Sequence, residues 1–181
     1  PFSGTGVKVL ADYDFRSNAA PEFTTHWDLR DKDLDYDMLR RQLAEWREYS
    51  PNFMGDYYPL TPFAPDKSAW MGWQFNRPEE GKGMVQIFRR ENSIYTAAQL
   101  PLRDLEPEGM YTVTDIDKRV AVQVSGTELM DRGIPLIMDE RPSAKVFLYE
   151  RTGNLYAGAL LSAALVAWMF ASSQVIAPIP I

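Results

Sequence analysis

The chain contains no cysteine and only one histidine, His26. It can therefore form neither a disulfide nor a thiolate nucleophile, and one histidine cannot supply the several nitrogen or sulfur ligands that a zinc site needs. It also lacks any run of five basic residues, and its net charge is −6. Because nucleic-acid binding depends on clustered positive charge, these absences predict no metal site and no nucleic-acid partner.

Hydrophobic residues make up 45% of the 181 residues, which is enough for one full-sized core. Residues 1–4 show neither an initiator methionine nor the basic flank and apolar run of a signal peptide. Such a start is typical of a truncated or partial reading frame. Composition divides the chain into three zones, residues 1–62, 63–151 and 152–181, and the last zone carries no charge.

The first zone predicts one strand and one helix. Residues 22–28 alternate β-branched and aromatic side chains, which favours a strand. The acidic run at residues 31–37 opens a helix, and Ser50-Pro51 ends it. The apolar stripe of this helix consists of Tyr36, Leu39, Leu43 and Trp46. A closed β/α barrel needs about 250 residues, so we expect only the last strand–helix unit of such a barrel.

The second zone predicts short strands separated by turn signals, which favours an antiparallel, Greek-key-like β-sandwich. Residues 126–133 fit one or two helical turns, with Thr127 as the cap and a glycine at the end. The sets expected to share a strand face are Met71, Trp73 and Phe75; Val85 and Ile87; Ala98, Leu100 and Leu102; Val120, Val122 and Val124; and Val146 and Leu148. The fold class expected is mainly β, with a remnant β/α unit in front and an apolar tail behind.

Three blocks of sequence carry a family resemblance. They are Gly-Asp-Tyr-Tyr-Pro-Leu-Thr-Pro at 55–62, Ala-Trp-Met-Gly-Trp-Gln-Phe-Asn-Arg-Pro at 69–78 and Gly-Met-Val-Gln-Ile-Phe-Arg-Arg at 83–90. Together they resemble the junction between the catalytic barrel and the C-terminal β-sandwich of melibiase-type α-galactosidases of the raffinose family. The similarity covers most of residues 15–151, whereas the flanking residues fit weakly or not at all.

The resemblance implies a retaining, cytoplasmic enzyme that releases terminal α-galactosyl residues from oligosaccharides without a metal or organic cofactor. It places the nucleophile and the acid/base, both aspartates, on earlier barrel strands. Neither of their sequence contexts is found here, so no catalytic residue is assigned. We expect the C-terminal portion of such an enzyme, with a structural role, contacts that support a homo-oligomer, and no activity by itself.

Three residues are candidates for a sugar site. Asp28 closes the predicted strand at the functional end of a barrel, and the aromatic face of Trp27 suits the apolar C–H surface of a sugar. Arg16 can hold a carboxylate by bidentate hydrogen bonds. The structural alternatives are a barrel-wall position for Trp27, a turn cap for Asp28 and an ion pair for Arg16. Elsewhere in the chain, the adjacent pair Arg89 and Arg90 is expected at a solvated strand end.

A barrel–sandwich interface is predicted from Asp56, Tyr57, Tyr58 and Trp70. The two tyrosines would fill the seam between the domains, and Asp56 would satisfy backbone donors. Trp73 and Phe75 share one strand face and are expected in the core. Trp70 lies on the opposite face.

Residues 156–177 are mostly apolar and long enough to cross a bilayer, for which about 20 residues are needed. Ala, Gly and Ser dilute the segment, and Arg151 is the only basic residue nearby, so a packed or separate appendage is the alternative. A rival function follows, a stand-alone carbohydrate-binding or interaction module held at a membrane by this segment. A further rival is an enzyme whose site is completed by another chain.

Overall fold

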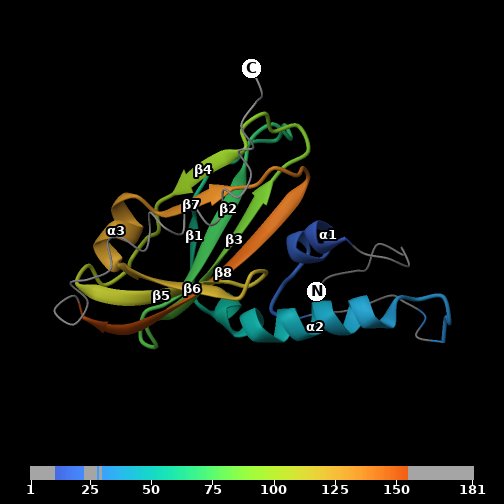
Figure 1. Cartoon of the computed structure of the whole chain (residues 1–181), viewed down its shortest axis with the longest axis horizontal. Helices are drawn as coiled ribbons and strands as arrows, with labels where there is room; N and C mark the ends of the chain where they lie inside the picture. Colours follow the sequence, from blue (N-terminus) through green and yellow to red (C-terminus); the bar gives the residue numbers. More distant parts are fainter. Residues whose placement is uncertain (1–10, 23–27, 29, 155–181) are drawn as a thin grey trace, which may run out of the picture.

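The computed structural model describes residues 11–22, 28 and 30–154. Its largest element is a six-stranded sheet in which every neighbouring pair is antiparallel (Figure 1). In spatial order its strands are β1 (Asp56–Pro59), β2 (Met71–Arg77), β3 (Lys82–Arg89), β8 (Ser143–Asn154), β5 (Gly109–Asp115) and β6 (Val120–Ser125). Because β8 lies between β3 and β5, the end of the described chain returns to the middle of the sheet.

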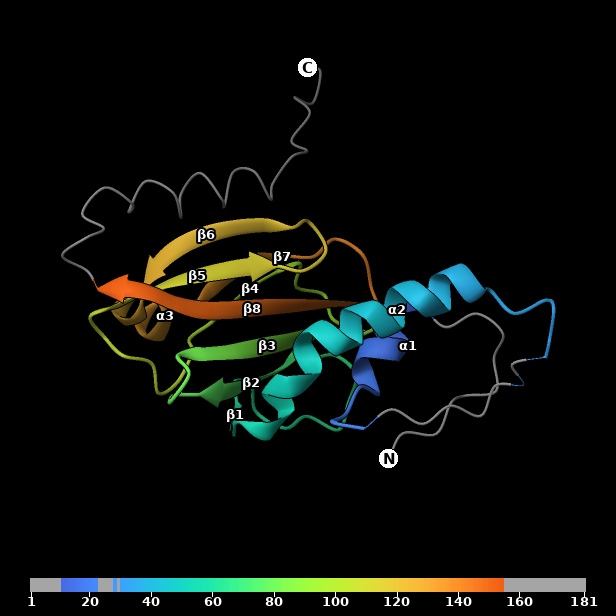
Figure 2. The same ribbon diagram turned by 90° about the horizontal axis from the view of Figure 1, so that it is seen from below.

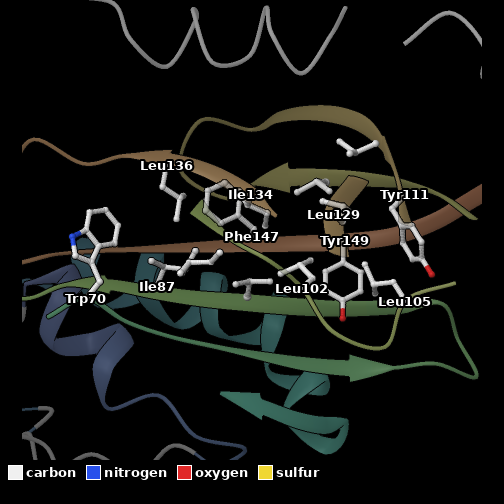
Figure 3. Packing of buried hydrophobic residues seen from close by; sticks show 14 of the residues in the cluster. Trp70, Ile87, Leu102, Leu105, Tyr111, Leu129, Ile134, Leu136, Phe147 and Tyr149 are labelled. Carbon is white, nitrogen blue, oxygen red and sulfur yellow. The ribbon is translucent and has the colours of Figure 1, made fainter. Parts of the chain in front are cut away.

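A second, two-stranded sheet completes the sandwich. It pairs β4 (Ala97–Leu100) with β7 (Ile134–Ile137), and together with helix α3 (Gly126–Asp131) it covers one face of the large sheet (Figure 1). The main core fills the space between these layers. Its residues labelled in Figure 3 are Trp70, Ile87, Leu102, Leu105, Tyr111, Leu129, Ile134, Leu136, Phe147 and Tyr149. The predicted mainly β, antiparallel sandwich is therefore confirmed.

Helices cover part of the opposite face of the large sheet. They are α1 (Asp12–Ser17), α2 (Tyr36–Tyr49) and the short 3₁₀ helix η1 (Ser50–Met54), and Figure 2 shows α1 and α2 in front of the strands. A smaller core cluster lies beneath them and consists of Tyr49, Met84, Ile116 and Val146. The large sheet is thus buried on both faces along β3, whose residues are nearly all buried.

Helix α2 agrees with the helix predicted from the acidic run and the apolar stripe. Asp35 caps it, because its carboxylate accepts a hydrogen bond from the Met38 amide at 2.9 Å. Leu39 is buried as predicted, but so is Gln42, which the stripe did not include. The Gln42 amide finds a partner inside the protein, since its Nε2 donates to Asp12 Oδ1 at 3.0 Å.

Helix α3 occupies the predicted helical turns, but Thr127 is not its cap. Ser125 precedes the helix with extended backbone, and its hydroxyl accepts a hydrogen bond from the Glu128 amide at 3.1 Å. The Thr127 hydroxyl instead donates to the Pro107 carbonyl at 2.9 Å. The predicted terminal glycine is Gly133, whose φ of 72° is the left-handed conformation that ends many helices.

Helix α1 is not predicted by the sequence. It has no side-chain cap and only six residues, so tertiary contacts of its two buried residues, Phe15 and Arg16, must hold it in place. Of the strand predicted at 22–28, residues 23–27 lie outside the described residues, and Asp28 is not in a strand. Strand β1 falls within residues 1–62, yet it pairs with β2, so the sandwich sheet begins before residue 62.

Candidate functional site

Strand β2 turns a polar face toward the main core. Gly72, Gln74 and Asn76 are buried on that side, whereas Trp73 and Phe75 are only half-buried on the side that faces the helices. Neither residue therefore lies in the main core between the two sheets; Phe75 packs against the smaller core cluster beneath the helices, and Trp73 packs on Phe88. The reason is that both faces of β2 are covered, and the loop between β4 and β5 requires polar partners on the inner one.

The buried amides of β2 fix this loop. Gln74 donates from Nε2 to the Arg103 carbonyl at 2.8 Å and accepts from the Arg103 amide at 2.7 Å. Asn76 donates from Nδ2 to the Asp104 carbonyl at 2.7 Å. Buried backbone groups outside regular structure need such partners. The loop is thus held by side-chain bonds rather than by a neighbouring strand.

The Tyr149 hydroxyl joins the two amides from the other side. It donates to Asn76 Oδ1 at 2.8 Å and accepts from Gln74 Nε2 at 2.9 Å. Burial raises the pKa of Tyr149 and outweighs the opposite effect of the Gln74 bond, so the hydroxyl stays protonated. Gly83 makes room for it, because a Cβ there would overlap the Tyr149 hydroxyl and the Phe75 carbonyl.

A cavity of about 170 Å³ lies where this loop approaches β8. Its polar lining includes Asn76, Asp104, Glu106 and Arg151. A more open hollow of about 420 Å³ adjoins it and shares Glu106 and Arg151 with it. Tyr58 on β1 donates its hydroxyl to Asp104 Oδ2 at 3.1 Å, which ties the edge strand to the loop.

This cavity can bind hydroxyl groups, because carboxylates accept hydrogen bonds and a guanidinium donates them in a fixed plane. Asp104, Glu106 and Arg151 are all exposed. Retaining glycosidases instead hold one of two facing carboxyl groups in surroundings that keep it protonated. The cavity therefore resembles a shallow polar binding site more than a glycosidase active site.

Arg16 lines neither of these two hollows. It is only 3% exposed and binds Glu45 bidentately, at 2.8 Å from Nε to Oε1 and 2.9 Å from Nη2 to Oε2. It also pairs with Asp117 and donates from Nη1 to the Ala144 carbonyl at 2.8 Å. Burial opposes its charge, but the bonds to Glu45 and Asp117 outweigh burial and raise its pKa. This geometry is the structural ion pair that the sequence left open as the alternative.

Asp28 lies in an exposed turn. Its carboxylate accepts hydrogen bonds from the Arg30 amide and from Arg30 Nε, both at 2.9 Å, and the Arg30 side chain lowers the pKa of Asp28. Within the described residues no hydrogen bond or ion pair joins Asp28 to Arg16, so the structure does not bring them into one site. Trp27 lies outside the described residues.

The four predicted interface residues separate into two groups. Asp56, Tyr57 and Tyr58 lie on β1, an edge strand, and Tyr57 is 56% exposed. Trp70 is 8% exposed within the main core (Figure 3), where its indole N–H donates to the Tyr95 carbonyl at 3.0 Å. Burial therefore leaves Trp70 almost no surface for contact with a second domain.

Sequence reasoning also missed several polar residues of the interior. Arg89 was expected in solvent but is 3% exposed, and its guanidinium donates to the carbonyls of Met138, Asp139 and Ser93. Gln74 carried a usable signal, because it alternates with two large aromatics and so must face whatever covers the other side of β2.

In the part of the chain that the structure describes, no cluster of three His, Cys, Asp or Glu side chains is arranged to hold a metal ion. No helix among those same residues is both long and apolar enough to span a membrane. The segment 156–177, for which a membrane span was considered, lies outside the described residues.

No protein-family model and no curated protein sequence matches the chain. Solved structures do match it. The GH36 α-galactosidase AgaA of Geobacillus stearothermophilus superposes with a TM-score of 0.65 at 17% identity. The chain has the fold of one part of GH36 α-galactosidases. AgaB of the same organism matches with a TM-score of 0.60 at 17% identity, and a doubly substituted AgaA in complex with raffinose matches with 0.64 at 16%.

These matches cover 83% of this chain but 21% of each enzyme chain. The chain therefore spans about a fifth of the length of the enzymes that it matches, which fits the predicted resemblance to a C-terminal portion. At such low identity the likeness establishes the fold. Raffinose binding is a property of the AgaA complex.

Proposed function

We propose that this chain is the C-terminal β-sandwich portion of an α-galactosidase-type glycoside hydrolase and that its role there is structural. The observation that carries the proposal is the unequal coverage, since most of this chain matches a small part of much longer GH36 enzymes. The intact enzyme would release terminal α-galactosyl residues from oligosaccharides. This portion would support the catalytic unit, and we expect no activity from it alone.

The ion pairs of the described residues favour a structural role. Retaining hydrolysis needs two carboxyl groups about 5–5.5 Å apart across the scissile bond. The most enclosed ionisable groups are already engaged, as Arg16 with Glu45 and Lys145 with Asp115 at 2.9 Å. Such pairs hold elements of the fold together.

The surface best suited to contact a catalytic unit is the β1 edge, defined by Met54, Asp56, Tyr57 and Tyr58. Met54 is 79% exposed and lies two residues before the start of this strand. Tyr57 rests on Phe75, with ring centroids 5.4 Å apart, so its position is fixed before any partner binds. Exposed apolar side chains that are gathered and rigidly backed favour a protein interface.

An assay of galactose release tests the proposal. The purified chain is incubated with an aryl α-galactoside, beside a complete α-galactosidase as the positive control. We expect release by the complete enzyme only. Release of galactose by the isolated chain would contradict the structural role.

A second candidate, a carbohydrate-binding module, is favoured by the cavity with Asp104, Glu106 and Arg151. Titration of the chain with raffinose distinguishes it from a purely structural domain. Binding that is stronger than millimolar and is lost in Arg151→Met would support the module. Lys82→Met is the matched control, since Lys82 is a half-buried strand residue, paired with Glu150, that does not line this cavity. Absence of binding would leave the structural role.

A further inference from the structure

Strand β6 forms one edge of the six-stranded sheet. It pairs with β5 on one side, and no described strand pairs with its other side (Figure 2). Backbone N–H and C=O groups on such an open side are free to pair with another strand. The residues on β6 are Val120, Ala121, Val122, Gln123, Val124 and Ser125.

The sequence of β6 does nothing to block such pairing. It contains no charge, no proline and no glycine, and three of its six residues are valine, which favours strands. Natural proteins protect open edges with charged residues, proline, bulges or very short strands. A bulge in the large sheet lies between β5 and β8, on the inner side, and not at the β6 edge.

The other three open edges of the two sheets are protected. β1 has only four residues, begins with Asp56 and ends with Pro59. β4 also has four residues and is followed by Pro101, and β7 contains Pro135. Among these described edges, β6 alone has more than four residues, and no proline lies in it or next to it; Arg119, directly before it, is held by Glu48 at 2.7 Å.

We propose that two copies of this chain associate through β6, which pairs antiparallel with β6 of the second copy. The two large sheets then continue into one another across a two-fold axis. An isologous contact of this kind needs no second surface, because the same strand supplies both sides.

A second copy fits this edge for two reasons. Near the two-fold axis each residue lies opposite the same residue of the second copy or a neighbour on the same strand face. A charged residue there would face its own copy and repel it, and β6 contains no charged residue. The strand is also flanked by opposite charges, with Lys118 and Arg119 before it and Glu128 in the first turn of α3 after it. Antiparallel pairing brings the basic end of one copy to the acidic end of the other.

The outer side chains of β6 carry no charge. Ala121 and Gln123 are exposed and alternate with Val122 and Val124, which pack toward the main core. Substitutions at Ala121 and Gln123 therefore change the edge without removing core contacts.

The test measures the mass of the full chain in solution by sedimentation. We expect wild type to reach twice the 20.7 kDa of one chain as concentration rises. The variant Ala121→Lys/Gln123→Lys should remain a monomer at the same concentrations. The matched control Ala97→Lys/Gln99→Lys places the same substitutions at the same spacing on exposed positions of β4 and should dimerise like wild type.

Rescue excludes misfolding as the cause. The Lys variant mixed with Ala121→Glu/Gln123→Glu should form mixed dimers, since opposite charges then face each other. Cysteine substitution gives a second readout, because the chain has no cysteine of its own. Opposite residues of an antiparallel pair lie about 4.5–5.5 Å apart, within disulfide range. In the register that places Val122 opposite itself, Gln123 of one copy faces Ala121 of the other. Gln123→Cys, mixed with Ala121→Cys, should therefore oxidise to covalent dimers, and Gln99→Cys should not.

Three results would overturn the proposal. One is a wild-type chain that stays monomeric at high concentration. Another is a dimer that survives the paired lysines on β6. The third is a dimer lost equally in the β4 control, which would place the contact elsewhere.

Discussion

The buried cation of Arg16 gives the sharpest prediction about stability. Arg16→Met removes the guanidinium but keeps a long apolar side chain. It leaves Glu45, whose side chain is 10% exposed, as an unpaired charge beneath α1, and it leaves the Ala144 carbonyl without its side-chain donor. Removing one partner of a buried ion pair costs about 3–5 kcal/mol, because the remaining charge stays desolvated.

That loss is a large part of the 5–15 kcal/mol by which domains are typically stable. The free energy of unfolding, measured by urea denaturation, should therefore fall by about 3–5 kcal/mol in Arg16→Met. The matched control is Arg41→Met, since Arg41 pairs with Asp12 but is 56% exposed. Exposed pairs contribute about 0–1 kcal/mol, so this variant should unfold almost like wild type.

Two added substitutions refine the test. Adding Glu45→Gln and Asp117→Asn to Arg16→Met removes the uncompensated charges and should restore part of the lost stability. Equal, small losses in Arg16→Met and Arg41→Met would refute the reasoning. They would mean that Arg16 is not a buried structural cation, and its assignment to a ligand site would have to be reconsidered.

Three further predictions concern single groups. Because Ser125 caps α3, Ser125→Ala should lower the free energy of unfolding by about 1 kcal/mol in thermal or urea denaturation. Thr127→Ala should lower it by clearly less. The reverse order would make Thr127 the cap. Burial raises the pKa of Tyr149 above the value of about 10 for a free tyrosine. The neutral hydroxyl therefore contributes its whole stabilising effect below about pH 10, and this contribution falls as the pH rises further. Tyr149→Phe should therefore lose less stability than wild type between about pH 9 and pH 11, and parallel losses would contradict this. The pKa of Asp12 is lowered from 3.8, since bonds from Arg41 and Gln42 outweigh its burial. The ionised carboxylate therefore stabilises the fold fully above about pH 4, and this effect disappears as the pH falls further. In Asp12→Asn the free energy of unfolding should depend less on pH in the acid range. An unchanged dependence would refute the role of Asp12.

The strand pattern was predictable from the sequence because alternation with period two survives wherever one face is buried. Val120, Val122 and Val124 fell on β6 as expected. Alternation fails as a guide where both faces are covered. On β2 the buried inner face carries Gln74 and Asn76, which pair with a loop distant in sequence, and no local pattern identifies that loop.

The predicted site residues show a related limit. Arg16 and Glu45 are 29 positions apart, and their pairing depends on how α1 packs on α2. Sequence reasoning could list an ion pair as an alternative for Arg16 but could not name its partner. Arg151 was noted only as the last charge before an apolar segment, although it lines two adjoining hollows. The cavity forms only when β8 lies beside the loop before β5.

The rate of hydrolysis of an aryl α-galactoside by the purified chain, compared with Asp104→Asn and Glu106→Gln, tests the central claim most directly. The account predicts no turnover above the buffer rate in any of the three proteins, since this portion supports a catalytic unit that lies elsewhere. Turnover by wild type that disappears in either variant would show that the sandwich carries its own catalytic carboxylates, and would contradict the account.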